Sequence, residues 1–248
     1  MYAAGLTDVG VTRSQNQDAI FVCNNAIGPL PNLFIVADGM GGHNAGDVAS
    51  NLAVEKFTGF IRDFAAQDFI RPENFLDLLV SAAQHAGKEI TEKAESDESM
   101  MGMGTTLTAC VITDEKVFIA HIGDSRAYAV NMLNMNQLTN DHTFVNELLQ
   151  TGRVSEEEAK THPKRHVLTK VLGVPGFAEI DGLIFDIGDA AAILLCSDGL
   201  SNMLEEEAMM RIINGLGYVE HRTRYLIDEA NKKGGRDNIS AVLIDVGR

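Results

Sequence analysis

The order of strand-like and helix-like segments constrains the fold of this 248-residue chain more than any other feature. Short apolar runs rich in Val, Ile, Leu and Phe predict strands, and runs with helical spacing predict helices. Strands are expected at 3–9, 19–23, 33–37, 105–112, 117–121, 126–130, 191–196 and 239–246, and helices at 45–64, 72–94, 205–213 and 218–232. Strands and helices therefore occur in blocks, which favours an α+β sandwich of two antiparallel sheets flanked by helices over a doubly wound parallel sheet.

Residues 139–176 interrupt this order, because they are rich in charge and His and carry little strand signal. Pro163 and Pro175 lie within them, and a short helix is expected only at 144–150. Long irregular segments in compact domains tend to be functional. The chain, 1–248, is therefore interpreted as one domain with an insertion beside its core.

The formal net charge of −15 disfavours binding to nucleic acid or to anionic membranes. No apolar run reaches the roughly 18 residues of a membrane-spanning helix, and the start of the chain has neither a basic segment nor an apolar signal core. A cytoplasmic protein without direct membrane insertion is therefore expected. Cys23, Cys110 and Cys196 are far apart and form no CxxC pair, which argues against a disulfide framework or a cysteine zinc site.

Several aspartates lie where predicted strands end or begin. Asp38, Asp124 and Asp198 follow apolar strands, and Asp237 precedes the last strand. Carboxylates that converge at such positions would repel one another strongly unless cations lie between them. Oxygen ligands of this kind suit Mg²⁺ or Mn²⁺ better than Zn²⁺ or Cu²⁺. The alternative interpretation is that each Asp only begins a turn, as the common Asp-Gly pair often does.

These motifs, together with others in the same order, closely resemble bacterial members of the protein phosphatase 2C family over almost the whole chain. The resemblance implies a four-layer α-β-β-α sandwich with a two-metal site between its sheets, and hydrolysis of phosphoserine and phosphothreonine in proteins. The matching motifs are Thr7-Asp8-Val9-Gly10, Arg13, Asn16-Gln17-Asp18, Ala37-Asp38-Gly39-Met40-Gly41-Gly42, Gly104-Thr105-Thr106, His121-Ile122-Gly123-Asp124-Ser125-Arg126, Leu138-Thr139-Asn140-Asp141-His142, Cys196-Ser197-Asp198-Gly199-Leu200 and Gly234-Gly235-Arg236-Asp237-Asn238-Ile239.

The resemblance implies how the two cations, Mn²⁺ or Mg²⁺, would be held. Asp38 would bridge both of them. Asp198 and Asp237 would complete one site, and the carbonyl of Gly39 would bind the other cation. A hydroxide that bridges the cations would then attack phosphorus in line with the leaving serine or threonine oxygen.

Further residues would complete the implied site. Asp18 resembles the carboxylate that holds a cation through water, and Asp124 resembles the ligand of a third, weaker cation. Arg13 resembles the clamp on the substrate phosphate, because its guanidinium offers planar bidentate contact. His43 is a candidate for proton transfer, although here Met40, and not His, follows Asp38-Gly39. Residues 142–175 resemble a mobile flap beside the active site.

A covalent phosphoenzyme is not expected. None of the three cysteines is followed by Arg at the spacing of a cysteine-based phosphatase, and Ser125 and Ser197 have no evident base partner. The basic run 162–166 could meet phosphate or a protein substrate, or could be a solvated loop. The resemblance further implies an opposing serine/threonine kinase, whose phosphoprotein substrates this chain would share.

Two other functions are weighed against this interpretation. A two-metal phosphodiesterase or nuclease is disfavoured by the negative charge and by the lack of a basic groove pattern. A catalytically inactive phosphoprotein-binding module is disfavoured because Asp38, Asp198 and Asp237 are all present. Metal-dependent turnover of an aryl phosphate, compared with a diester, would separate the three.

Overall fold

The computed structural model describes residues 1–41, 45–64 and 70–247, and its strands form two antiparallel sheets. The first sheet has the order β1 (Tyr2–Asp8), β11 (Ile239–Asp245), β10 (Ala192–Cys196), β7 (Arg126–Val130) and β8 (Met135–Gln137). The second has the order β2 (Asp18–Cys23), β3 (Leu33–Met40), β5 (Leu107–Ile112), β6 (Lys116–Ile122) and β9 (Asp181–Asp186), with β4 (Gly104–Thr105) paired to β3.

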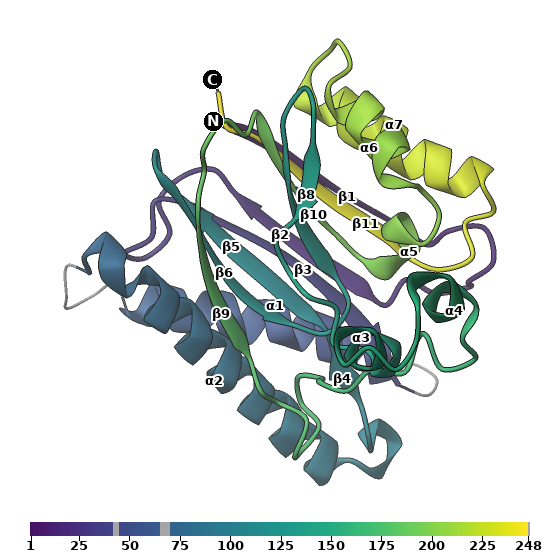
Figure 1. The fold of residues 1–248 in the computed structure, drawn as a ribbon. Coiled ribbons are helices and arrows are strands. Elements are labelled where there is room, and N and C mark those ends of the chain that lie inside the picture. Colours follow the sequence, from purple (N-terminus) through teal and green to yellow (C-terminus); the bar gives the residue numbers. More distant parts are fainter. Residues whose placement is uncertain (42–44, 65–69, 248) are drawn as a thin grey trace.

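Helices cover the outer face of each sheet (Figure 1). Helices α1 (Ala45–Phe64) and α2 (Phe75–Ser96) pack on the second sheet, and the short 3-10 helices Pro72–Asn74 and Glu98–Met100 flank α2. Helices α5 (Asp198–Ser201), α6 (Glu206–Ile213) and α7 (Val219–Lys232) lie on the first sheet. The expected four-layer α-β-β-α sandwich is confirmed.

Three apolar cores hold the four layers together, one at each interface between layers. Strand β3 shows why its sequence is apolar without interruption. Its residues Leu33 and Ile35 pack in the core beneath α1 and α2, whereas Phe34 and Val36 pack in the core between the sheets. Because alternate side chains of a strand point to opposite faces, a strand buried on both faces needs apolar residues at every position.

The structure departs from the sequence-based expectations at a few elements. The predicted strand 105–112 is divided into β4 and β5, and Pro72 begins a separate 3-10 turn rather than α2. Strands β8 and β9 and the one-turn helix α5 were not predicted. Strand β9 is an edge strand that is only half-buried, so it lacks the apolar run that marks β3.

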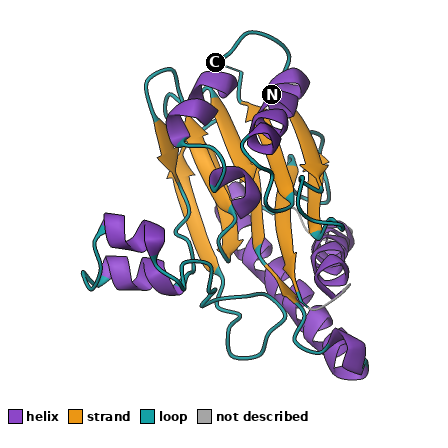
Figure 2. Cartoon of the chain, turned by 90° about the vertical axis from the view of Figure 1, so that its right-hand side faces the viewer, coloured by secondary structure: helices purple, strands orange, loops and turns teal. Residues whose placement is uncertain are grey.

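Within residues 142–175, a pair of short helices projects from the sandwich (Figure 2), whereas Leu172 is buried in the core beneath α1 and α2. Helix α3 (Phe144–Gln150) has the predicted bounds, whereas α4 (Glu156–Thr161) was not expected. Helix α4 contains almost no apolar residues, but Ser155 and Glu158 form a capping box at its start.

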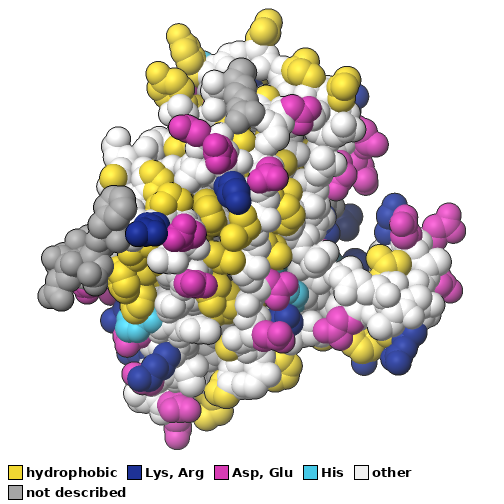
Figure 3. All heavy atoms as spheres, turned by 60° about the vertical axis from the view of Figure 1, so that its left-hand side comes forward, with side chains coloured by type: hydrophobic (Ala, Val, Ile, Leu, Met, Phe, Trp, Pro, Cys, Tyr) yellow, Lys and Arg dark blue, Asp and Glu magenta, His cyan; other side chains and the backbone are white. Residues whose placement is uncertain are grey.

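The surface is charged but mixed. On the face drawn in Figure 3, acidic and basic side chains of the described residues are interspersed, and they gather into no broad basic patch there. Within the part of the chain that the structure describes, no helix is long and apolar enough to cross a membrane.

Because the core between the sheets sets their spacing, we predict that Phe34→Ala lowers the free energy of unfolding by about 3–5 kcal/mol. Urea denaturation followed by circular dichroism measures this change. Leu216→Ala is the control, because Leu216 is fully exposed and its loss should change stability by no more than about 0.5 kcal/mol. Equal effects of the two substitutions would contradict the layered core.

Candidate metal centre and active site

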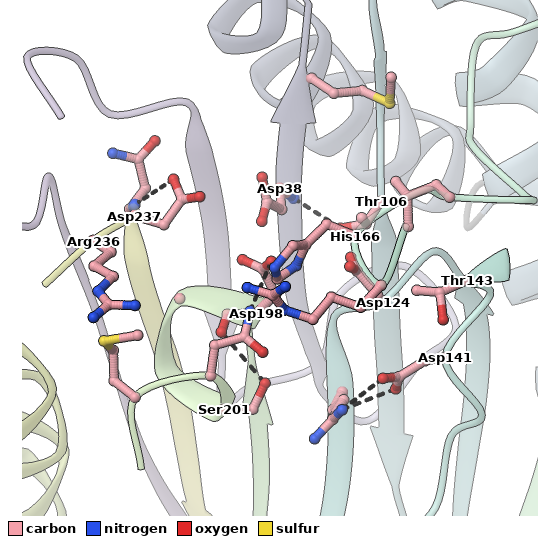
Figure 4. Close-up of a pocket in the computed structure, with 18 of the residues that line it drawn as sticks. Asp38, Thr106, Asp124, Asp141, Thr143, His166, Asp198, Ser201, Arg236 and Asp237 are labelled. Carbon is pink, nitrogen blue, oxygen red and sulfur yellow. Dashed lines mark hydrogen bonds and ion pairs between the residues drawn. The ribbon is translucent and has the colours of Figure 1, made fainter. Parts of the chain in front are cut away.

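A cavity of about 960 Å³ opens at the end of the sandwich where β3, β6 and β10 finish. Asp38 and Asp124 reach it from the second sheet, and Asp198 and Asp237 reach it from the first. Figure 4 shows Asp38, Asp124 and Asp198 around a shared space that His166 also approaches. The fold thus brings together four aspartates that lie far apart in the sequence.

Asp18 and Asp38 lie directly opposite each other in the pairing of β2 with β3. Oδ2 of Asp18 accepts hydrogen bonds from Ser197 Oγ at 2.8 Å and Ser240 Oγ at 2.7 Å. Its other oxygen, Oδ1, is buried and has no hydrogen-bond partner among the described residues. Burial is the main reason that the pKa of Asp18 rises to about 7, although both hydroxyls act in the opposite direction.

The backbone of Asp38 is fixed by its neighbours. Its N–H donates to Thr106 Oγ1 at 2.9 Å, and its carbonyl oxygen accepts from Thr105 Oγ1 at 2.9 Å and from the Thr106 N–H at 2.8 Å. Burial, followed by repulsion from Asp18 and the other aspartates of the site, raises the pKa of Asp38 well above its usual range. The carboxylate is therefore held rigidly where its charge is costly.

Gly39 lies at a close approach of strand and helix. A Cβ atom at this position would come within 2.0 Å of the carbonyl oxygen of Gly46, near the start of α1. No other residue fits there without movement of the backbone, and the carbonyl of Gly39 is accordingly fixed beside Asp38.

Asp198 and Asp237 approach each other from the ends of neighbouring strands. Asp198 begins α5 shortly after the end of β10, and Asp237 lies just before β11. A Cβ at Gly199 would come within 2.0 Å of the carbonyl oxygen of Asn238, so these two turns pack tightly together. Burial, and then repulsion from Asp237, raises the pKa of Asp198.

Asp124 occupies the turn between β6 and β7. Burial, and then repulsion from Asp198 and Asp141, raises its pKa well above the usual range, although Arg126 opposes that shift. Asp124 therefore belongs to the same electrostatic group as the other carboxylates.

Arg13 lies at the rim of the cavity, where its side chain is about half exposed. Its Nη2 donates to Asp237 Oδ2 at 2.8 Å, so the expected phosphate clamp is paired here with an expected cation ligand. Among the described residues, no three His, Cys, Asp or Glu side chains are close enough together to bind one metal ion in this conformation. His43, the candidate for proton transfer, lies outside the described residues.

Several residues of the site were not singled out from the sequence as contributors to it. Thr106 Oγ1 accepts a hydrogen bond from the backbone N–H of Asp38, and Ser240 Oγ donates one to Asp18. Arg236, which precedes Asp237 in the sequence, lines the cavity. Ser197, interpreted as a supporting or turn residue, donates to Asp18. Within the basic run 162–166, Arg165 and His166 line the cavity. The Gly104-Thr105-Thr106 motif was the one available signal for Thr106.

Comparison with known proteins gives consistent matches along the chain. A family model described as protein phosphatase 2C matches residues 11–243. The chain is 40% identical over 245 residues to the serine/threonine phosphatase stp of Listeria innocua, which covers 99% of this chain and 96% of that protein.

Solved structures agree with this match. The serine/threonine phosphatase Stp1 of Staphylococcus aureus has a TM-score of 0.90 and 32% identity, and the alignment covers 99% of this chain and 95% of that one. The catalytic domain of the serine threonine protein phosphatase PstP, in complex with two manganese ions, has a TM-score of 0.82 and 30% identity, with 98% of this chain and 97% of that one covered. This chain therefore belongs to the protein phosphatase 2C family and is a serine/threonine protein phosphatase.

Proposed function

We propose that this phosphatase hydrolyses phosphoserine and phosphothreonine with divalent cations held among Asp18, Asp38, Asp124, Asp198 and Asp237. The observation that carries the proposal is that Asp38, Asp124, Asp198 and Asp237 line one cavity, with buried Asp18 directly opposite Asp38 in the neighbouring strand. Buried carboxylates with no counter-charge are strongly disfavoured, and a divalent cation among them reverses that cost.

The donor atoms fit Mn²⁺ or Mg²⁺. Asp38 and the fixed carbonyl of Gly39 offer hard oxygen ligands side by side, as do Asp198 and Asp237 from the other sheet. Oδ1 of Asp18, which has no hydrogen-bond partner among the residues that the structure describes, would accept a hydrogen bond from water on a cation. Asp124, which lines the same cavity, would hold a further, weaker cation. The PstP structure, with its two manganese ions, supports this assignment.

When bound, the cations would lower the pKa of a shared water so that it attacks phosphorus directly, without a phosphoenzyme. The residues of this chain would supply binding and orientation. Arg13 would leave Asp237 and contact the phosphate oxygens through its planar guanidinium. His166 and Arg165, which also line the cavity, would contact the substrate, and His43 stays a prediction for proton transfer.

The cellular setting is part of the same proposal. Phosphoprotein substrates follow from the enzyme class, and we propose that an opposing serine/threonine kinase produces them. We also propose a cytoplasmic location and no nucleic-acid partner, in keeping with the net charge of −15.

Removal of the cations tests the proposal. We predict that EDTA abolishes turnover of a phosphothreonine peptide and that Mn²⁺ or Mg²⁺ restores it. Asp38→Asn, Asp198→Asn and Asp237→Asn should each lower kcat by orders of magnitude while circular dichroism stays unchanged. A diester substrate should not be turned over. Full activity after exhaustive chelation would exclude the mechanism.

The raised pKa of Asp18 predicts how stability changes with pH once cations are removed. The folded chain holds a proton on Asp18 up to about pH 7, whereas an unfolded Asp releases it near pH 4. Between these values the folded state binds more protons, so its stability falls as the pH rises. Thermal unfolding in EDTA should therefore show a lower Tm at pH 8 than at pH 5.

Asp18→Asn should make this pH dependence less steep, because the Asn side chain cannot ionise while the other carboxylates of raised pKa remain. Asp63→Asn, which changes an exposed carboxylate on α1, should leave the dependence as it is. Mn²⁺ should raise the Tm most at pH 8. A metal-free protein that is more stable at pH 8 than at pH 5 would contradict the buried, repelling carboxylates.

Arg13→Ala tests the phosphate clamp. Loss of a charge-assisted hydrogen bond is worth about 1.5–3 kcal/mol, so inorganic phosphate should inhibit roughly 10- to 150-fold more weakly. Manganese affinity, measured by calorimetry, should be retained. Arg71→Ala, at an exposed ion pair with Glu73, is the control and should change neither quantity. A collapse of metal affinity with intact phosphate affinity would show that Arg13 supports the cation site instead.

A further inference from the structure

His142 holds the backbone of Gly123 from both sides. The N–H of Gly123 donates to Nδ1 of His142 at 3.1 Å, and the N–H of His142 donates to the carbonyl oxygen of Gly123 at 2.8 Å. The other ring nitrogen, Nε2, lies 3.1 Å from Oδ2 of Asp181 on β9. The imidazole is almost fully buried, so these contacts are not exchanged readily with water.

The partners of the ring decide its tautomer. A backbone N–H can only donate, so Nδ1 of His142 must accept, and Nε2 must therefore carry the proton that it donates to Asp181. Burial lowers the pKa of His142, which favours this neutral form. The ring of His121 lies 4.8 Å away and is also kept neutral, because burial lowers its pKa to about 4.

The turn that is hydrogen-bonded to His142 contains Asp124. Gly123 has a φ of +106°, and a Cβ there would come within 2.5 Å of the side chain of Thr106. Thr106 in turn shares a 2.7 Å hydrogen bond with Ser125 Oγ. The turn 123–125 is therefore wedged between Thr106 on one side and His142 on the other.

The same residue joins this turn to the base of segment 142–175. The carbonyl oxygen of His142 accepts from the N–H of Thr169 at 2.9 Å. Lys170 Nζ donates to Oδ1 of Asp181 at 3.0 Å, so one carboxylate contacts both His142 and Lys170, near the end of the segment. The two ends of the segment thus meet at the residue that holds the turn.

We propose that His142 is a positioning residue: Asp181 fixes its tautomer, and its imidazole holds the turn 123–125 so that Asp124 faces the cavity. His142 lines no part of that cavity, so it acts through Gly123 and not by contact with the substrate. The proposal rests on the proposed role of Asp124 as a cation ligand. The proposal gives a function to His142 of the Leu138–His142 motif, a residue that has no role in the proposed chemistry.

Two substitutions separate positioning from packing. His142→Asn keeps an acceptor, Oδ1, close to the place of Nδ1, whereas His142→Leu removes it. Asn32→Leu is the matched control, because buried Asn32 also holds one peptide from both sides, through Ile112 N at 2.8 Å and Ile112 O at 2.6 Å. Asn32 and Ile112 lie at the opposite end of β3 and β5 from Asp38 and Thr106.

The first measurement uses the metal-free protein and is independent of activity. Amide hydrogen exchange of Gly123, followed by NMR, should become about tenfold faster in His142→Leu and stay near the wild-type rate in His142→Asn. Asn32→Leu should lower the Tm without affecting Gly123. Unchanged exchange in His142→Leu, or equal acceleration in Asn32→Leu, would overturn the proposal.

The second measurement concerns the cations. His142→Leu should weaken Mn²⁺ binding at the weakest site about tenfold in calorimetry and lower kcat for an aryl phosphate. KM and Mn²⁺ binding at the tighter sites should stay unchanged. His142→Asn should keep both the weakest site and kcat near their wild-type values. Asp124→Ala, which removes the proposed ligand itself, shows the largest loss of Mn²⁺ binding and kcat that is expected. If Asp124→Ala loses turnover while His142→Leu keeps the weakest site and kcat, His142 does not position Asp124. A wild-type protein without Mn²⁺-dependent turnover would refute the proposed function instead, and Gly123 exchange would still decide the role of His142.

Discussion

Repulsion between buried carboxylates is the constraint on which the rest of this structure depends. Asp18 and Asp38 face each other across β2 and β3, and the burial that fixes them also raises the pKa of both. A chain does not bring such groups together for stability, because each of them is costly to bury without a counter-charge. Cations are the counter-charge that we propose for this site, and the sandwich fixes the strand ends that carry its carboxylates.

The rigidity of these strand ends comes from layers and from glycines. Three apolar cores fix the two sheets, so strand ends from both sheets meet at one cavity. Gly39 and Gly199 allow close backbone contacts that no side chain would permit, and they lie next to Asp38 at the end of β3 and Asp198 at the start of α5. The arrangement also explains how a chain of net charge −15 can handle phosphate: bound cations, Arg13 and the basic run 162–166 would give the cavity a local positive field.

The sequence predicts most of the sandwich and singles out the four aspartates that line the cavity, for identifiable reasons. Strands such as β3 are buried on both faces and read as unbroken apolar runs, whereas the half-buried edge strand β9 and the polar helix α4 give no such signal. The aspartates are visible because each adjoins a strand. The sequence does not predict the ion pair of Arg13 with Asp237 or the hydrogen bonds between His142 and Gly123. Each contact joins residues that are distant in the sequence and that only the fold brings together.

Proton release on cation binding tests the central claim most directly. If the metal-free site keeps protons on its buried carboxylates, Mn²⁺ must displace them, and calorimetry at pH 6.5 in buffers of different ionisation enthalpy measures how many leave. The account predicts the release of about one proton or more per protein, falling when Asp18 is replaced by Asn. Tight binding of Mn²⁺ with no proton release, or no binding at all, would contradict it.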